Sequence, residues 1–351
     1  MNGGEPYDYY ETMLPHTLLK IWQPQPGKAL YINRYQTFNT LTDELGSMGS
    51  AEMHQLIRPG VRITRNYDNA PYPTNIQAYN GYIHAIQSVL VYDRLVPRGV
   101  LHERLRFDST TFLSEMINNN IRMSQKSQFS AMNGGGSGAR VAFPLDYFDG
   151  WISYSSENRF RYNVKGAFRA YQADGIQGWG NYDLAIKMPP LPTGTYEFRL
   201  PYSPMSHGGM MQFYLGTSKS LGSMIAIDIP LDVRIPEDDP RIGWTKFYEE
   251  DDLGVASDQA MRNRGYMRCP YSYMGHPESN EGNTTNQNCR GDATVSLRKI
   301  MGRFTIKQSQ EYWFRIKNVI PDETDLKWQM DYVEFIPLDV VDNDQYSEDW
   351  Y

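Results

Sequence analysis

The stretch Tyr182–Ser203, YDLAIKMPPLPTGTYEFRLPYS, has the pattern of a strand, a connection and a second strand. Its two ends are apolar and aromatic, a composition that suits the half-buried surface of a β-sheet. The middle is rich in proline and ends in Thr193-Gly194. Because proline lacks a backbone N–H and glycine tolerates turn conformations, a strand cannot continue through it. The stretch therefore predicts two consecutive strands of a β domain.

Similar runs bounded by turn residues follow toward the C-terminus: GGMMQFYLG (208–216), MIAIDIPLDVRI (224–235), ATVSLRKIMGRFTI (293–306), EYWFRIKNVI (311–320) and LKWQMDYVEFIPL (326–338). Many short strands with few helices are typical of a β-sandwich or jelly roll. In the last run the apolar residues from Trp328 to Tyr332 alternate and Glu334 follows, which predicts one strand with one buried face. We expect this sandwich to span 151–340.

The N-terminal part has shorter runs of β character, separated by turn and breaker residues: HTLLKIW (16–22), ALYINRY (29–35), GVRITRN (60–66) and YIHAIQSVLVY (82–92). In the last of these, His84 lies among apolar residues with no Cys, Asp or second His beside it. A catalytic or metal-binding histidine needs such a partner. We therefore expect His84 to be a buried strand residue whose ring nitrogens are hydrogen-bonded.

The segment 98–150 differs from both β parts. Apolar residues recur at helical spacing within 109–123, and Asp108 or Ser109 is placed to cap that helix. The glycine-rich MNGGGSGAR that follows matches neither phosphate-loop pattern and is expected to be a loop. The chain is thus predicted to be mainly β (α+β) in four parts: a β part at 1–97, a helical and loop connector at 98–150, the sandwich at 151–340 and an acidic tail at 341–351.

Composition narrows the classes of function. The chain has 351 residues, enough for two domains, and a net charge of −7 without a block of Lys or Arg, which argues against a nucleic-acid partner. No apolar run approaches the length of a bilayer span, and the first residues lack the pattern of a secretion signal. Either the protein stays in the cytoplasm, or the sequence lacks its natural beginning.

Tyrosine is abundant, with 26 Tyr against 14 Phe, and it suits both half-exposed sheet faces and sugar ligands. A sugar is held by an aromatic platform together with Asn, Asp or Arg side chains that bind its hydroxyls. The residues that fit this description are Trp179, Asn181, Tyr182, Trp244, Tyr271 and Tyr273. Packing in the core or at an interface explains each of the two tryptophans equally well.

Catalysis is not expected. Glycoside hydrolysis needs two carboxylates across a cleft, and the sequence does not pair any two of its strand carboxylates, Asp183, Glu197, Asp228, Asp232, Asp331 and Glu334. No nucleophile-elbow or zinc-protease motif is present. The long insertion at 236–267 carries the acidic pairs Asp238-Asp239 and Asp251-Asp252, which suit either calcium or a solvated charged loop. No cofactor is expected.

The two cysteines, Cys269 and Cys289, flank a polar stretch rich in Gly and Asn. Such a loop cannot order itself by burial, so we expect a disulfide across it, provided that the protein is exported. His276 lies between them, but two cysteines and one histidine do not give the spacing of a zinc site. No metal is expected here.

The stretch NGYIHAIQSVLVY resembles the C-terminal signature of fasciclin domains, with Asn80, Gly81, Ile83, His84 and Ile86 in the matching places. Gln87 stands where that signature has Asp, and the earlier Thr-containing box of the family is absent. The resemblance implies the closing part of a fasciclin-like domain at 1–97. It also implies adhesion or protein contacts, with a partner that completes the sheet and covers its apolar surface.

The region 101–338 is similar to the domain that follows fasciclin domains in surface lipoproteins of Gram-negative gut commensals. The residues that carry this resemblance are YDLAIKMPPLPTGTYEFRLPY, GMMQFYLG, IPLDVRI, RIGW, AMRNRGYM and WFRIKNV with MDYVEFIPL. The closing MDYVEFIPL also looks like the last strand of galactose-binding-like jelly rolls. The resemblance implies a non-enzymatic lipoprotein at the outer-membrane surface, anchored by a lipid outside this sequence, which binds a polysaccharide or assists a glycan importer or neighbouring lipoproteins.

Overall fold

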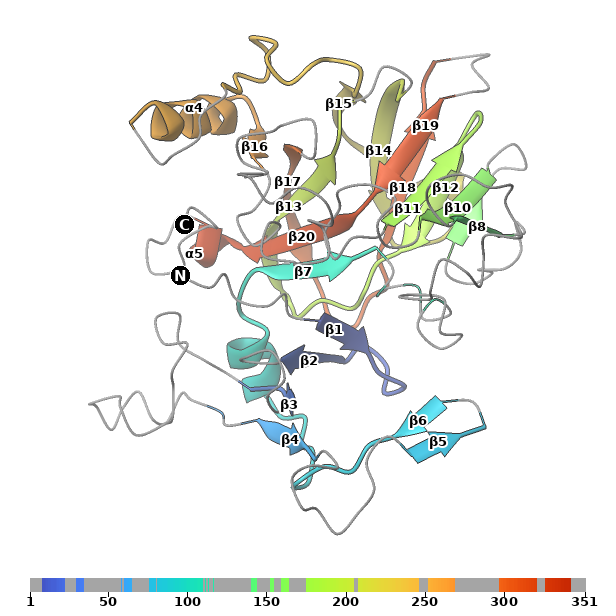
Figure 1. Cartoon of the computed structure of the whole chain (residues 1–351), viewed down its shortest axis with the longest axis vertical. Helices are drawn as coiled ribbons and strands as arrows, with labels where there is room; N and C mark the ends of the chain where they lie inside the picture. The colour runs from blue at the N-terminus through green and yellow to red at the C-terminus, as the bar shows by residue number, and fades with distance from the viewer. Residues whose placement is uncertain are drawn as a thin grey trace, which may run out of the picture.

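The computed structural model describes residues 8–22, 30–34, 58, 60–64, 76–79, 81–109, 111, 113, 116, 140–143, 152–154, 159–163, 175–204, 208–245, 252–268, 297–320 and 326–341. Among these residues 48% lie in strands and 12% in helices. The chain is therefore mainly β, as the sequence predicts. Figure 1 shows a large β body with a smaller group of strands below it.

Two five-stranded antiparallel sheets and one four-stranded sheet make up the large body (Figure 1). Sheet I has the order β16-β17-β13-β20-β7, with the bounds Tyr266–Arg268, Leu297–Ile306, Gly194–Tyr202, Tyr332–Pro337 and Leu105–Asp108. Sheet II has the order β15-β14-β18-β12-β9, with the bounds Ile225–Asp232, Met210–Gly216, Trp313–Asn318, Asp183–Lys187 and Ile152–Tyr154. Consecutive strands β12 and β13 lie in different sheets, so the proline-rich stretch between them carries the chain across the sandwich.

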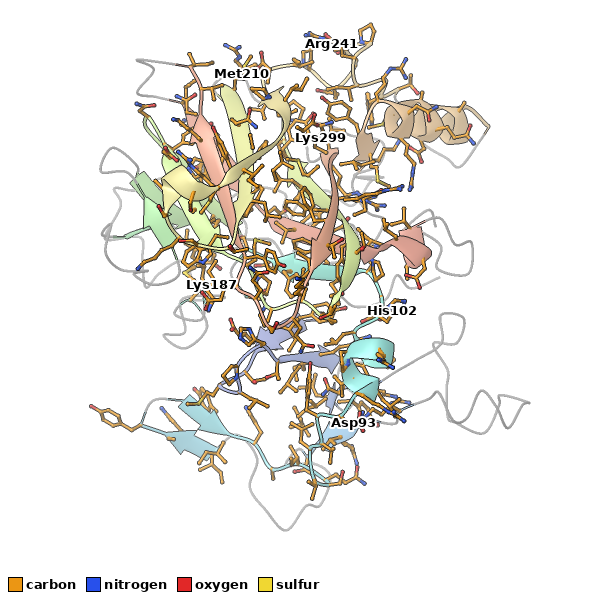
Figure 2. The ribbon with its side chains drawn as sticks, turned by 180° about the vertical axis from the view of Figure 1, so that it is seen from behind. Asp93, His102, Lys187, Met210, Arg241 and Lys299 are labelled. Carbon is orange, nitrogen blue, oxygen red and sulfur yellow. The ribbon has the colours of Figure 1, made fainter. Side chains whose placement is uncertain are left out.

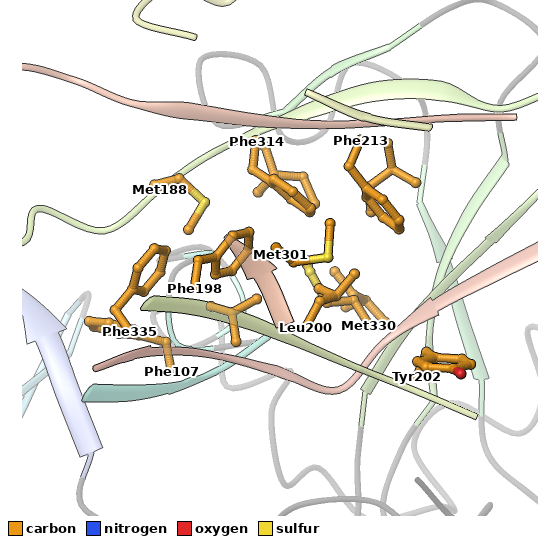
Figure 3. Packing of buried hydrophobic residues seen from close by; sticks show 14 of the residues in the cluster. Phe107, Met188, Phe198, Leu200, Tyr202, Phe213, Met301, Phe314, Met330 and Phe335 are labelled. Atoms are coloured by element: carbon orange, nitrogen blue, oxygen red, sulfur yellow. The ribbon is translucent and has the colours of Figure 1, made fainter. Parts of the chain in front are cut away.

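Aromatic side chains fill the space between sheets I and II (Figure 3). Phe198 of sheet I stacks on Phe335 at 4.7 Å between ring centroids and meets Phe314 of sheet II edge-on at 5.1 Å. Phe314 in turn stacks on Phe213 at 5.6 Å. Each such pair contributes about 0.5–1.5 kcal/mol beyond the burial of its area. The two sheets thus pack face to face around one core, and the β-sandwich prediction is confirmed.

The stretch Trp328–Leu338 does not form the single strand expected from its alternation. It breaks at Asp331 into β19 (Lys327–Met330) and β20. The two strands lie in different sheets, because β19 pairs with β11 while β20 pairs with β13 and β7. Every residue of β20 is buried, so neither of its faces is the solvent side that the pattern assumed. The third sheet has the order β19-β11-β10-β8, and its other strands are Gly175–Trp179, Arg159–Asn163 and Arg140–Phe143.

The N-terminal sheet has the order β1-β2-β3-β4, with the bounds Asp8–Glu11, Leu18–Trp22, Leu30–Ile32 and Val61–Ile63. Three of the four predicted N-terminal runs are therefore strands. The sheet is attached to the start of β7 by a buried contact. Tyr9 lies 5.4 Å from Phe107 between ring centroids, and both the Tyr9 hydroxyl and the Lys20 ammonium reach the Glu103 carboxylate, at 2.7 and 2.6 Å.

The fourth run behaves differently. β5 (Ile76–Ala78) and β6 (Gly81–Ile83) form a hairpin that projects from the rest of the molecule (Figure 1). A bridge between Ile63 and Ile86 links the following residues to β4. His84 comes after β6 and is exposed, so the prediction of a buried strand histidine is wrong. The apolar neighbours in its sequence are exposed too, since nothing packs over the described faces of this short hairpin.

The segment 98–150 contributes two strands that the sequence did not predict, since β7 forms an edge of sheet I and β8 forms an edge of the third sheet. A short helix, η2 (Val96–Val100), precedes β7. Of the helix expected within 109–123 the structure describes only Ser109, Thr111, Leu113 and Met116, and the glycine-rich loop and most of the acidic tail lie outside the described residues. The insertion at 236–267 contains a helix that was not predicted either, α4 (Asp252–Asn263), and α5 (Leu338–Val341) follows β20.

Candidate functional site

One end of the sandwich carries a group of aromatic and charged side chains where the edge of sheet II meets the edge of sheet I. The group comes from β15, from the loop that follows it, and from β16 and β17. Figure 2 shows two of its members, Arg241 and Lys299, at the same end of the molecule. We call this group the sandwich-edge cluster and define it as Asp228, Asp239, Arg241, Trp244, Tyr266 and Lys299.

Asp228 occupies its place because β15 carries a bulge. The pairing of β15 with β14 shifts between Met211 and Phe213, and Asp228 adopts a left-handed backbone with φ of 50°. The buried Gln212 amide stabilises this bulge by donating to the carbonyl oxygens of Ile227 at 3.1 Å and Asp228 at 3.2 Å. A bulge re-aims a side chain. Here the Asp228 carboxylate lies 3.3 Å from the Lys299 ammonium of the other sheet.

Tyr266 and Lys299 are direct partners across β16 and β17, which places their side chains on one face. The Lys299 ammonium lies 4.8 Å from the centroid of the Tyr266 ring, a cation–π contact. Burial raises the pKa of Tyr266, and the negative charge of Asp228 raises it further. The Tyr266 hydroxyl is therefore neutral and can both donate and accept a hydrogen bond.

The loop after β15 presents a second carboxylate. The Arg241 guanidinium donates to both oxygens of Asp239, at 2.8 Å each, and the Arg241 backbone N–H donates at 2.9 Å. The hydrogen bond from the Arg241 side chain is the main reason why the pKa of Asp239 falls to about 2. Asp232 and Arg234 form the same arrangement two residues apart. These carboxylates are ionised and neutralised by their own neighbours.

Trp244 is held at the rim of the cluster by Arg268. The guanidinium carbon of Arg268 lies 5.3 Å from the centroid of the Trp244 indole. The same guanidinium donates to Asp258 at 2.5 Å and to the Ser257 hydroxyl at 2.6 Å, both on α4, and to the Thr245 carbonyl at 2.8 Å. Arg268 is 2% exposed, and these hydrogen bonds link α4 to the loop that carries Trp244. Trp244 remains partly exposed.

The cluster therefore offers two partly exposed rings beside hydrogen-bond donors and acceptors. Such a combination suits a polar ligand with flat apolar patches, which is the chemistry of a sugar. It suits acid–base catalysis poorly, because Asp228 and Asp239 are both engaged by cations. Trp244 was predicted as a binding residue from the sequence. Tyr266 and Lys299 were not, since only the pairing of β16 with β17 brings them together.

The other predicted binding residues lie elsewhere. Asn181 is exposed, 3.5 Å from the Asn318 amide nitrogen. Tyr182 is a core residue: it is fully buried, its hydroxyl donates to the Gly208 carbonyl at 3.3 Å, and burial raises its pKa well above the usual range. Tyr182 immediately precedes β12 (Asp183–Lys187), and its ring packs edge-on against the buried Trp328 at 6.4 Å between centroids. The side chain of Trp179, together with Tyr271, Tyr273, Cys269, Cys289, His276 and Asp251, lies outside the described residues.

The remaining strand carboxylates lie in ion pairs or at a backbone contact. Arg315 donates to both oxygens of Asp183, at 2.6 and 2.7 Å, on the outer face of sheet II, and Arg199 donates to Glu197 at 2.7 Å. Asp331 is buried at the break between β19 and β20, where its carbonyl accepts from the Ser109 N–H at 2.8 Å.

Glu334 is the most deeply buried of these carboxylates, on the outer face of sheet I. It pairs with Arg106 at 2.6 Å and with Arg298 at 3.0 Å, and its side chain is 0% exposed. Burial alone would raise its pKa, but the positive charges of Arg298, Arg106, Arg104 and Arg199 hold that pKa at about 2. A carboxylate that stays ionised to this pH does not serve as a general acid near neutrality. It is part of the structure of sheet I.

The described residues contain no group of three or more His, Cys, Asp and Glu side chains arranged to hold a metal ion. Of the acidic pairs considered for calcium, Asp239 is bound to Arg241 and Asp238 is exposed. In the part of the chain that the structure describes, no helix has the length and apolar character needed to span a membrane.

Comparison with known proteins identifies no family for this chain. No family model matches the chain, and no curated protein does. A xanthan lyase from Paenibacillus is similar in structure, with 9% sequence identity and a TM-score of 0.28, and the match covers 53% of this chain and 12% of the lyase. At this level of similarity the lyase carries no argument about function, and the chain spans a small part of the lyase's length.

Proposed function

We propose that this chain is a non-enzymatic glycan-binding protein and that the sandwich-edge cluster is its binding surface. The observation that carries the proposal is the placement of Tyr266 beside Lys299 and Asp228, with Trp244 over Arg268, which lies two residues along β16 from Tyr266. Flat rings meet the apolar face of a sugar, while the charged groups bind its hydroxyls. The ion pairs that engage the strand carboxylates also favour binding over hydrolysis.

The resemblances in the sequence extend this proposal to a cellular context. We propose a fasciclin-domain surface lipoprotein of the outer membrane that works as an accessory of a glycan importer. This part rests on the resemblance of the motif around Asn80–Ile86 to the fasciclin signature and on the resemblance of the strand sequences within 101–338 to the domain that follows it. Labelling of intact cells with an antibody against the sandwich tests it, since a protein confined to the cytoplasm would stay unlabelled until the cells are lysed.

Affinity electrophoresis through gels that contain single polysaccharides tests the binding function. We expect retardation by at least one polysaccharide and about tenfold weaker binding for Lys299→Ala, a loss of about 1.4 kcal/mol. Lys219→Ala is the matched control, because Lys219 is an exposed lysine in the turn between β14 and β15, outside the cluster. Trp244→Ala should weaken binding further, provided that its thermal midpoint shows that it folds.

Two results would overturn the proposal. Migration unaffected by every polysaccharide would leave no glycan-binding function, and retardation equal in Lys299→Ala and wild type would place the site elsewhere. Release of sugar products from the same panel would show an enzyme instead. The alternative function, an adhesive or structural scaffold acting through the N-terminal part, is favoured by one observation, the exposed apolar hairpin β5–β6.

A further inference from the structure

The hairpin β5–β6 and the residues after it form an exposed apolar segment, which we call the arm and define as 76–79 and 81–91. Ile76 and Ile83 are partners on one face of the hairpin, and Gln77 and Tyr82 are partners on the other. Ile83 is 57% exposed and Tyr82 is 63% exposed, so neither face is covered. The other strongly exposed apolar side chains of the arm are Ile76, Tyr79, Ile86, Val89 and Val91.

A two-stranded hairpin of this kind has marginal stability on its own in water. Among the described residues the arm is joined to the chain around β4 mainly by polar contacts. The Ile63–Ile86 bridge is made by two backbone bonds, in which Thr64 N–H donates to the Ala85 carbonyl at 3.0 Å and Gln87 N–H donates to the Arg62 carbonyl at 2.9 Å. The Thr64 hydroxyl also donates to the Ala85 carbonyl at 3.0 Å, and Arg58 donates to the Val91 carbonyl at 2.9 Å, so the apolar side chains of the arm gain little burial from these contacts. An apolar surface of this kind, exposed on both faces, marks a site of protein contact.

The arm also lacks charge. Residues 69–92 contain no Asp, Glu, Lys or Arg, although the chain has 34 basic and 41 acidic residues. Proteins normally protect exposed strand edges with charges, prolines or bulges. The edge strand β15 shows this protection, with a bulge, the charged Asp228 and Pro230. The arm has no charge of this kind, so its edges stay open to pairing.

We infer that the arm joins two copies of this chain, edge to edge, about a two-fold axis. In such an interface each surface meets its own copy, so any charge near the axis faces a like charge. Two chains of net charge −7 repel each other, and contact through a charge-free surface adds no close pair of like charges to that repulsion. Antiparallel pairing of two β6 or two β5 edges extends the hairpin to a four-stranded sheet, which buries isoleucine and tyrosine from both copies.

Sedimentation equilibrium of the full chain tests the inference. We expect a mass of twice 40.6 kDa that falls to 40.6 kDa on dilution. Ile83→Asp should remain at the single mass at every concentration, because an isologous contact would set two carboxylates beside each other. Ile225→Asp is the matched control: Ile225 is 78% exposed on the edge strand β15, and this variant should still dimerise.

Both variants change exposed side chains, so circular dichroism and the thermal midpoint of the dilute protein should match those of wild type. A wild-type chain that stays at 40.6 kDa at high concentration overturns the inference. So does a dimer that persists in Ile83→Asp, or one that is lost in Ile225→Asp. Retention of a different protein by the arm of a monomeric chain would show that the surface serves a different partner.

Discussion

Sheet I buries charged side chains, whereas the arm exposes apolar ones. On the outer face of sheet I, Glu334 and Arg199 are 0% exposed and lie among opposite charges. In the arm, Ile83 is 57% exposed and no acidic or basic residue lies within 69–92. Both regions have the apolar alternation of strands. The comparison shows that burial is decided by what covers a strand, not by the strand's own pattern.

The two regions also differ in the free-energy cost of losing a side chain's partner. A buried carboxylate is tolerated in sheet I because Arg106 and Arg298 donate to it from two other strands. Removing one partner from such a group leaves charge without compensation, which costs far more than the pair contributes. An exposed isoleucine in the arm carries no comparable penalty in the single chain. Substitutions in sheet I should therefore cost far more stability than substitutions in the arm.

Glu334→Ala should produce the largest loss. It leaves Arg106 and Arg298 buried without their carboxylate, and we expect the free energy of unfolding to fall by about 3–5 kcal/mol. Urea denaturation followed by tryptophan fluorescence measures the change. Asp239→Ala is the control, since it leaves an Arg241 side chain that is 67% exposed and keeps its contact with water, and it should leave the midpoint nearly unchanged. Equal losses in the two variants would contradict a special role for burial in sheet I.

The same carboxylate predicts a pH dependence. The pKa of Glu334 is lowered from 4.5 to about 2 in the folded chain. Its contribution to stability is therefore complete above pH 4.5 and is lost as the pH falls through 2, because the unfolded chain takes up the proton first. This loss amounts to about 3 kcal/mol. The stability difference between wild type and Glu334→Gln should shrink over that range, and a constant difference would refute the assignment.

The same substitution, glycine to alanine, can be made in the large β body and in the arm, and its effects on stability can be compared. A Cβ at Gly178, in β11, would lie 2.1 Å from Nε1 of the fully buried Trp328, whereas a Cβ at Gly81, in the arm, would meet nothing within 4 Å. Gly178→Ala should cost about 1–3 kcal/mol through overpacking, and Gly81→Ala should cost nothing. Thermal unfolding of both variants measures this, and a destabilised Gly81→Ala would show that the arm is packed after all.

The sequence alone predicted the strands well where local pattern decides them. The runs that contain β12, β13, β14, β15, β17 and β18 were all recognised, as were three N-terminal strands. It failed at Trp328–Leu338, because a strand that changes sheets keeps its apolar character but reverses its faces at Asp331. It also missed β7, β8 and α4, which have short or weak patterns and are fixed by the sheets and strand that they pack against.

The candidate site was harder to predict because it depends on pairing between distant strands. Trp244 was found from its residue type, but Tyr266 and Lys299 become neighbours only through the register of β16 on β17. The buried charges were invisible for a similar reason. Glu197 and Arg199 are two residues apart in β13, so the sequence alone places them on one face of a strand. Their burial depends on the segments that cover this face, which the local sequence does not reveal.

The smallest expected effect concerns the arm itself. Ile83→Ala in the dilute, monomeric chain should change the free energy of unfolding by less than about 0.5 kcal/mol, as for other exposed positions. Ile316→Ala, at a core position of β18 that is 2% exposed, should cost about 2–5 kcal/mol for the same side-chain truncation. At high concentration the Ile83→Ala difference should grow, because binding of a second copy stabilises the wild type by mass action. A difference that is large already in dilute solution would mean that Ile83 packs within its own chain, and the contrast with sheet I would fail.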